Sequence, residues 1–191
     1  MTAFVVNMKP TVDLDDEQFY QLCRQNPDLK FERSATGELI IMPPTGGESG
    51  RRNADLVIDL GIWNRKAGLG VVFDSSTGFK LPNGADRSPD AAWVELSRWQ
   101  ALTPEQREKF PPIAPDFVVE LRSRTDNLET LQTKMREYLE NGVRLGLLLN
   151  PQARQVEVYR LGEAMQVLEN PHSVSCEPEL PGLVLDLDGI L

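Results

Sequence analysis

The sequence predicts an α/β fold in which a mixed central β-sheet is flanked by helices. Three observations lead to this prediction. Short apolar runs bounded by turn residues cluster in the middle of the chain. Segments with apolar residues at helical spacing lie on either side of these runs. The resulting mixed order of strands and helices is typical of α/β domains.

The composition fits one globular domain over residues 1–191, long enough to bury a full hydrophobic core. Cys23 and Cys176 show no motif spacing, so we expect neither a disulfide framework nor a zinc site. The N-terminal segment lacks a secretory pattern, and no run approaches the roughly 20 apolar residues that span a bilayer. We therefore expect a cytoplasmic protein with no membrane partner.

The net charge of -9 argues against a general nucleic-acid coat protein, which would normally be basic. A nuclease is still compatible with it, because a local cationic groove can lie on an acidic body and a bound divalent metal offsets clustered carboxylates. The single histidine, His172, lies in a turn-like segment. A Ser-His-Asp triad or a histidine-based metal site therefore has almost no residues to build it.

The first expected helix covers about residues 14–26, where an aspartate can cap its start and a proline lies past its end. The segment GELIIMPP, residues 37–44, is expected to form a strand closed by prolines. A second helix is expected within residues 45–70, because apolar residues recur at near-helical spacing and Gly68 provides a stop.

The middle of the chain is expected to supply most of the sheet. Residues 71–96 alternate short apolar runs with turn signals, which predicts two or three antiparallel strands. A short surface helix is expected at residues 103–112, followed by the apolar strand at residues 115–121. Residues 144–168 predict a strand, a turn and a further hairpin, and the tail at about 180–188 predicts a last strand.

The clearest element is a helix from about Asn127 to Asn141. Asp126 can cap its start, and Glu129 three residues later completes an acidic variant of the capping box. At ~100° per residue, Lys134 falls on one flank of the apolar stripe and not on the fully solvated face. Its amine can therefore reach a neighbouring group, and ordinary snorkelling of a surface lysine is the alternative.

Two segments share one form, SPDAAWVEL at residues 88–96 and APDFVVEL at residues 114–121. Asp90 begins the first apolar strand, and Glu120 ends the second. If the two strands pair antiparallel, both carboxylates come to the same end of the sheet. Glu120 also lies among residues that favour burial, so its charge needs a compensating group.

A divalent cation with oxygen ligands is the usual remedy for two carboxylates held close together. Lys134 would enter from the helix that begins just after Glu120. Metal, paired carboxylates and an ammonium form a constellation for hydrolysing a phosphodiester, because the cation polarises the phosphoryl oxygen and lowers the pKa of a bound water. The alternative is that Asp90 caps a turn after proline and that Glu120 only fringes a sheet.

At these residues the sequence resembles a known family. The phrases that carry the resemblance are GELIIMPPTGGESGRRNADL, VVFDSSTGFKLPNGADRSPDAAWVELSRWQALTPEQREKFPPIAPDFVVELRSRTD and KMREYLENGVRLGLLLNPQARQVEVYR. They resemble the Uma family of restriction-type endonucleases, within the PD-(D/E)xK nuclease superfamily. The resemblance runs from about Leu14 to the C-terminal LPGLVLDL. It implies a restriction-endonuclease-like core at about residues 37–165, with the N-terminal helix at about 14–26 and the C-terminal strand at about 180–188.

The resemblance also implies an activity and a site. It implies action on DNA with Mg²⁺, for which Mn²⁺ is a possible substitute, and a homodimer, because double-strand cleavage by this fold usually joins two active sites. It maps the proline-aspartate pair to Pro89-Asp90 and the acidic member of the third motif to Glu120. Asp116 also follows a proline, but it lies four residues before Glu120 on the same strand and is a less natural partner.

The chain departs from the superfamily pattern at the lysine. Arg122 stands two residues after Glu120, and Lys134 on the following helix is the matching lysine. Arginine hardly ever deprotonates, so Arg122 is a poor general base, although it could clamp a phosphate. Glu48 is the candidate acidic residue from the first core helix, unless the helix dipole alone favours it there. The cations that could contact phosphate, or that are simply scattered over the surface, are Arg51, Arg52, Arg65, Lys66, Lys80 and Arg87.

These observations together predict a metal-dependent endonuclease that hydrolyses DNA phosphodiester bonds. Asp90 and Glu120 are the predicted metal ligands, and Lys134 is the predicted catalytic cation. The alternative function is that of a catalytically inactive nuclease-fold module that binds DNA or a protein partner.

Overall fold

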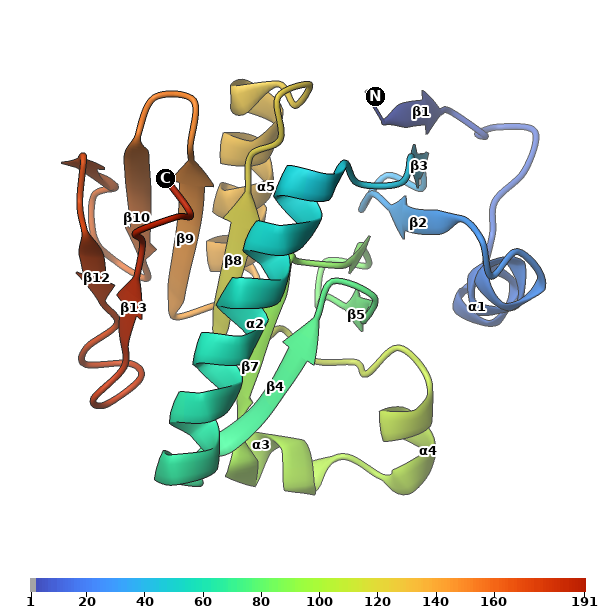
Figure 1. The fold of residues 1–191 in the computed structure, drawn as a ribbon. Helices are drawn as coiled ribbons and strands as arrows, with labels where there is room; N and C mark the ends of the chain where they lie inside the picture. Colours follow the sequence, from blue (N-terminus) through green and yellow to red (C-terminus); the bar gives the residue numbers. More distant parts are fainter. Residues whose placement is uncertain (1–2) are drawn as a thin grey trace.

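The computed structural model describes residues 3–191 as β-sheets flanked by helices (Figure 1). The helices are α1 (Asp16–Gln25), α2 (Gly47–Ala67), α3 (Leu96–Ala101), α4 (Pro104–Glu108) and α5 (Leu128–Glu140). The strands are β1 (Phe4–Val6), β2 (Lys30–Arg33), β3 (Leu39–Met42), β4 (Gly70–Asp74), β5 (Phe79–Lys80), β6 (Asp86–Arg87), β7 (Ala91–Glu95), β8 (Phe117–Leu121), β9 (Leu145–Asn150), β10 (Gln155–Arg160), β11 (Gln166–Glu169), β12 (Ser173–Ser175) and β13 (Val184–Asp186).

The central sheet has the strand order β11-β10-β9-β8-β7-β4. Strands β8 and β9 are parallel, whereas the other neighbours pair antiparallel. Parallel neighbours need a crossover connection, and α5 provides it between β8 and β9. Helix α2 covers one face of this sheet and α5 covers the opposite face (Figure 1). The predicted fold class, a mixed central sheet flanked by helices, is confirmed.

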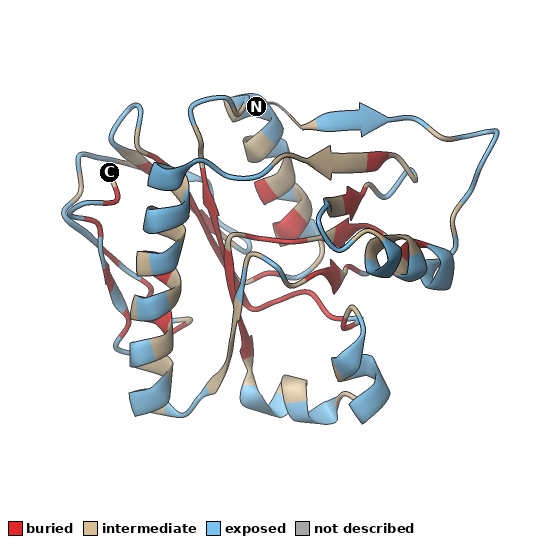
Figure 2. Cartoon of the chain, turned by 45° about the vertical axis from the view of Figure 1, so that its right-hand side comes forward, coloured by how far each residue is buried: buried red, intermediate tan, exposed pale blue. Residues whose placement is uncertain are grey.

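The two-residue period of a strand divides β7 and β8 between the two faces of the sheet. The side chains of Ala91 and Val119 join the core on the α2 side. Those of Ala92 and Val118 join the core on the α5 side. Figure 2 shows how thoroughly these middle strands are buried. Glu120 shares its face with Val118, so this glutamate is directed to α5.

A second sheet, called here the N-terminal sheet, has the order β1-β3-β2-β6-β5. The sequence predicted β3 but neither β1 nor β2. Strand β2 reads KFER, in which three charged residues obscure any apolar pattern, yet Glu32 and Arg33 are buried. Arg33 can be buried because its Nε donates to the carboxylate of Asp86 at 2.8 Å on the neighbouring strand β6.

The two long helices differ in how well the sequence predicted their ends. Helix α2 ends at Ala67 and is capped by Gly68, whose left-handed backbone, with a φ of 67°, suits glycine as predicted. The predicted cap of α5 was wrong. The Asp126 carboxylate accepts the Ser123 N–H at 2.7 Å in the preceding turn, so it is already occupied. The Asn127 side chain accepts the Thr130 N–H at 3.1 Å and caps the helix instead.

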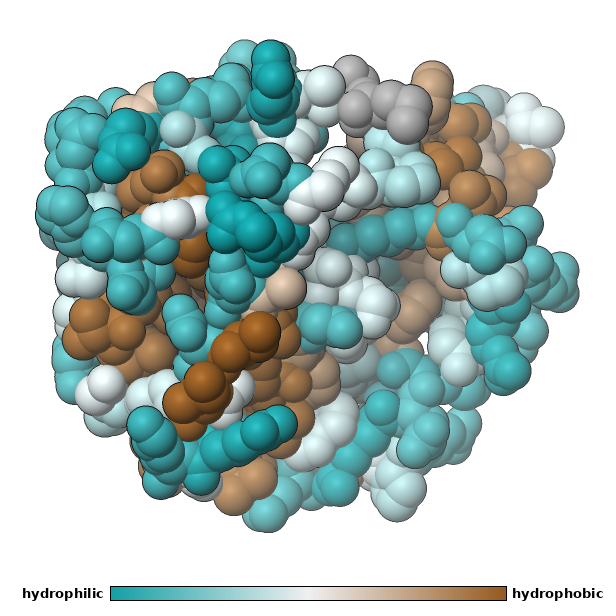
Figure 3. Space-filling model, viewed as in Figure 1, coloured by the Kyte–Doolittle hydropathy of each residue, from teal (hydrophilic) through white to brown (hydrophobic). Residues whose placement is uncertain are grey.

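The C-terminal strands β12 and β13 form a small sheet beside α2, of which the sequence predicted only β13. Ile58 and Ile62 on α2 and Val184 on β13 are exposed. Figure 3 shows apolar side chains gathered over this outward face of α2. None of the helices within residues 3–191 combines the length and the apolar character that crossing a membrane requires.

Gly70, at the start of β4, provides a test of core packing. A Cβ atom there would lie 2.3 Å from the Val94 carbonyl oxygen and 2.4 Å from the Trp93 ring. Gly70→Ala is therefore expected to lower the free energy of unfolding by about 1–3 kcal/mol, measured by urea denaturation. The control is Gly61→Ala within α2, where a Cβ meets nothing within 4 Å. The control is expected to be stabilised by about 0.5–1 kcal/mol, and equal effects of the two substitutions would contradict the close approach at Gly70.

Candidate active site

Asp90 and Glu120 lie at the same end of the central sheet. Asp90 directly precedes β7, and the antiparallel register pairs Ala91 of β7 with Val119 of β8. The next position in this register places residue 90 opposite residue 120. Asp90 Oδ2 also accepts the backbone N–H of Leu121 at 2.8 Å. The antiparallel pairing expected from the sequence is present, and it brings the two carboxylates together.

A matching contact closes the far end of the same strand pair. Asp116 precedes β8, and its Oδ2 accepts the backbone N–H of Glu95, the last residue of β7, at 2.8 Å. Asp116 Oδ1 lies 2.7 Å from Arg98 Nη1 and 3.1 Å from Arg144 Nε. These two arginines compensate the charge of Asp116, which lies at the opposite end of the strand from Glu120.

Lys134 meets Glu120 from α5. Lys134 and Tyr138 are one turn apart on this helix and therefore project to the same side. Lys134 Nζ lies 2.8 Å from Glu120 Oε1, and the Tyr138 hydroxyl donates to the same oxygen at 3.0 Å. The Lys134 side chain is only 12% exposed. It is therefore a nearly buried cation and not a snorkelling surface lysine.

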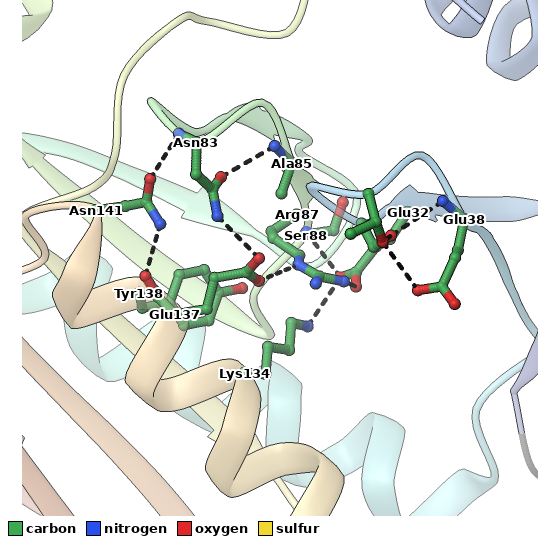
Figure 4. Close-up of polar contacts among 12 residues, drawn as sticks. Glu32, Glu38, Asn83, Ala85, Arg87, Ser88, Lys134, Glu137, Tyr138 and Asn141 are labelled. Atoms are coloured by element: carbon green, nitrogen blue, oxygen red, sulfur yellow. Dashed lines mark hydrogen bonds and ion pairs between the residues drawn. The ribbon is translucent and has the colours of Figure 1, made fainter. Parts of the chain in front are cut away.

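Glu32 of β2 is a further member of this group. Its Oε1 accepts from Lys134 Nζ at 2.8 Å and from the backbone N–H of Ser88 at 2.9 Å. Its Oε2 accepts from Arg87 Nη1 at 3.1 Å. Figure 4 shows Lys134 and Arg87 approaching Glu32 from different elements. We refer to Glu32, Lys134 and Glu120 as the buried triad.

Sequence reasoning missed Glu32 because it missed the strand that carries it. A signal was present nonetheless: the turn-like SATG, residues 34–37, separates KFER from the predicted strand LIIM and is typical of a hairpin. Recognising that hairpin would have placed Glu32 on a sheet. Its contact with Lys134 joins residues 102 positions apart in the chain, which no local pattern encodes.

Burial and neighbouring charges set the protonation of the buried triad. Burial raises the pKa of Glu120 to about 7, with further rises from Asp90 and Glu32 and an opposing effect of Lys134. Burial also disfavours ionised Glu32, but Lys134 and Arg87 outweigh it and lower the pKa of Glu32 to about 2. Burial alone would lower the pKa of Lys134, whereas Glu120 and Glu32 raise it above its usual value. Near neutral pH, Glu120 is therefore the member of the triad that titrates.

The surroundings of Asp90 fit a divalent cation. Asn53 of α2 donates from Nδ2 to Asp90 Oδ1 at 3.0 Å. Asn53 Oδ1 is buried and has no hydrogen-bond partner among residues 3–191. Carboxylate and amide oxygens are the donors that Mg²⁺ and similar hard cations prefer. Within the described residues no three His, Cys, Asp or Glu side chains gather as a metal-binding group. The candidate oxygen donors at this sheet end are the Asp90 and Glu120 carboxylates and the Asn53 amide oxygen.

Glu48 does not join the group. Its side chain is 74% exposed and pairs with Arg51 at 3.4 Å. Helix α2 presents Asn53 to Asp90 instead, because the two positions on α2 face different directions around the helix axis.

Arg122 and two of the predicted phosphate-binding cations, Lys80 and Arg87, bind other groups of the protein. Arg122 Nη1 donates to Asn150 Oδ1 at 3.2 Å, at the end of β9. Lys80 pairs with Asp16, and Arg87 is held in the interior by Glu32. Arg65 and Lys66 are exposed in the last turn of α2.

Removing the ammonium of Lys134 tests the energetic role of the buried triad. Lys134→Met leaves Glu32 and Glu120 buried without their shared cation, so the free energy of unfolding at pH 8 is expected to fall by about 3–5 kcal/mol. The control is Lys66→Met, which removes an exposed lysine from α2 and is expected to cost less than about 1 kcal/mol. Urea denaturation of the two variants gives the comparison. Equal losses would mean that Lys134 carries no special charge compensation.

Comparisons with known proteins identify the family and the fold of this chain. The chain matches none of the curated proteins with which it was compared. Its fold is similar to the crystal structure of a "putative nuclease belonging to DUF820" from Anabaena variabilis, with a TM-score of 0.76 and 20% sequence identity, over 91% of this chain and 95% of that chain. Residues 16–188 match the Uma2 family, described as "Putative restriction endonuclease". Because that match spans most of the chain, the protein belongs to the Uma2 family.

Proposed function

We propose that this protein is a metal-dependent endonuclease that hydrolyses the phosphodiester bonds of DNA. The observation that carries the proposal is the 2.8 Å contact between Lys134 Nζ and Glu120 Oε1, at the sheet end where Asp90 also lies. Paired carboxylates beside an ammonium are the groups that phosphodiester hydrolysis uses. Membership of a restriction endonuclease family supports DNA as the substrate.

In this proposal Asp90 and Glu120 hold a divalent cation, Mg²⁺ or Mn²⁺, and Asn53 Oδ1 is a further oxygen donor. When bound, such a cation polarises a phosphoryl oxygen and lowers the pKa of a water ligand. The protein keeps its two carboxylates in place through neutral donors. Asp90 accepts from the Leu121 N–H and Glu120 accepts from the Tyr138 hydroxyl, so neither carboxylate depends on the cation for its position.

Lys134 acts as a fixed positive charge and not as a general base. Although burial alone would lower its pKa, Glu120 and Glu32 raise it, so Lys134 stays protonated near neutral pH. A protonated ammonium in a water-poor site stabilises the negative charge that develops on the phosphoryl oxygens in the transition state. It also has protons to donate to an oxygen of the attacking water, which orients that nucleophile.

We further propose a homodimer, because double-strand cleavage by this fold usually joins two active sites. The exposed side chains of Ile58, Ile62 and Val184 support self-association, since clustered apolar surface favours burial against a partner.

Cleavage of supercoiled plasmid in the presence of Mn²⁺ tests the nuclease proposal. The wild-type protein is expected to nick or linearise the plasmid. Glu120→Gln keeps the shape of the side chain and removes its charge, so the rate is expected to fall at least about a hundredfold. Glu140→Gln, at an exposed glutamate of α5, is the matched control and should keep the wild-type rate. Equal nicking by the Glu120→Gln variant and the wild-type protein would point to a contaminating nuclease and end the proposal.

Metal binding is expected to depend on pH through Glu120. Burial, assisted by Asp90 and Glu32 and opposed by Lys134, places its pKa at about 7, and a divalent cation needs the ionised carboxylate. The proton and the cation therefore compete, and the affinity falls as the pH falls through this pKa. By calorimetry, Mn²⁺ affinity is expected to be about tenfold weaker at about pH 6 than at about pH 8, with about one proton released per ion at the lower pH. An affinity that stays constant over this range would exclude Glu120 as a ligand with the assigned pKa.

A further inference from the structure

Glu32 is neither a proposed cation ligand nor the catalytic cation, yet it contacts two parts of the site. We propose that Glu32 is a positioning residue of the active site, which holds Lys134 beside Glu120 and fixes the chain that leads into Asp90. This inference rests on the proposed nuclease function. It extends the working site from the central sheet to β2 of the N-terminal sheet.

The first contact orients the ammonium. Lys134 Nζ lies 2.8 Å from Glu32 Oε1 and also 2.8 Å from Glu120 Oε1. A lysine side chain is a flexible stem with a compact charge, so a single partner does not fix its direction. Two carboxylates from different strands, Glu32 of β2 and Glu120 of β8, restrict its direction. If Glu120 binds a divalent cation, the Lys134 ammonium still has its contact with Glu32, because Glu32 is not a ligand of that cation in the proposal.

The second contact fixes the main chain before Asp90. Glu32 Oε1 accepts the N–H of Ser88 at 2.9 Å, and Pro89, which follows, has its φ locked by its ring. Anchoring Ser88 therefore limits the path by which the chain reaches Asp90. One carboxylate oxygen thus links the catalytic ammonium to the proline-aspartate segment.

Glu32 can perform this role because it is itself immobilised. Its side chain is 4% exposed, and its second oxygen pairs with Arg87 Nη1 at 3.1 Å. Arg87 also pairs with Glu137 of α5, with 2.6 Å between Nε and Oε2, but the bonds of Glu32 to Arg87 Nη1 and to the Ser88 N–H do not involve Glu137. Figure 4 shows this chain of contacts, in which Arg87 lies between Glu32 and Glu137 and Lys134 approaches Glu32 separately. Charge-assisted hydrogen bonds of this kind are short and directional, so they define one geometry.

Glu137 supplies a matched control for the kinetic test. Glu32→Gln and Glu137→Gln each remove one negative charge from a partner of Arg87, but only Glu32 is bonded to Lys134 in the contacts described above. For plasmid cleavage with Mn²⁺, Glu32→Gln is expected to lower kcat at least about tenfold and to leave the KM for DNA within about twofold. Glu137→Gln is expected to leave both within about twofold. An equal fall of kcat in both variants would assign the effect to Arg87 and the general packing, and would overturn the inference.

Glu32→Asp tests the length of the side chain separately from its charge. It also serves as the second variant if Glu32→Gln does not fold. It keeps the anion beside Arg87 but shortens the side chain by about 1.5 Å, so kcat is again expected to fall. A wild-type kcat in Glu32→Asp would mean that any negative charge in this neighbourhood suffices, and the positioning role would be wrong.

A readout without cleavage distinguishes this inference from the nuclease proposal. The ¹H–¹⁵N signal of the Lys134 ammonium, assigned by its loss in Lys134→Arg, is expected in the wild-type protein and in Glu137→Gln, because hydrogen bonds hold this group away from water. It is expected to shift or disappear in Glu32→Gln and Glu32→Asp. An unchanged signal in both Glu32 variants would overturn the inference. Absence of plasmid cleavage by the wild-type protein would instead defeat the proposed function and leave this result readable.

Discussion

The placement of one ammonium between two buried carboxylates is the constraint on which the rest of the structure depends. Lys134 lies 2.8 Å from both buried carboxylates and compensates their charge, together with Arg87 in the case of Glu32. The wider cluster consists of Asp90, Glu32, Glu120, Glu137, Lys134 and Arg87. It therefore holds two more acidic than basic side chains, an imbalance that one divalent ion would neutralise. The apolar strand β8 can carry Glu120 near its end because α5 supplies the Lys134 ammonium and the Tyr138 hydroxyl as partners.

Three parts of the fold contribute side chains to this cluster. The central sheet contributes the two carboxylates at one end of β7 and β8, the crossover helix contributes the lysine, and the N-terminal sheet contributes the second carboxylate. The N-terminal sheet is therefore more than a covering layer, because its most buried charge lies against the crossover helix. Loss of any one element would leave charges of the other two without partners in a place that excludes water.

Much of this arrangement was predictable, and the failures have physical causes. The apolar runs and turn signals predicted the central sheet, and the two Pro-Asp segments predicted carboxylates at one end of it. The family resemblance indicated the lysine of α5. Strand β2 was missed because its charged residues are buried through distant ion pairs, which leave no apolar alternation. Glu48 lies away from this group and Asn53 is the side chain that α2 turns to Asp90, because five steps of ~100° place the two side chains about 140° apart around the helix.

An aspartate holds each end of the antiparallel pairing of β7 and β8: Asp90 accepts the Leu121 N–H at one end, and Asp116 accepts the Glu95 N–H at the other. Both Pro-Asp segments therefore stabilise the pairing of the two strands. Of the two aspartates, only Asp90 also lies at the end of the sheet that Lys134 approaches. The consequence concerns how an inactive form of the protein is made. Asp90→Ala would remove the hydrogen bond to the Leu121 N–H as well as the negative charge, so a loss of activity could come from either change. Asp90→Asn keeps an oxygen that accepts the Leu121 N–H and removes only the charge, so it separates the two effects.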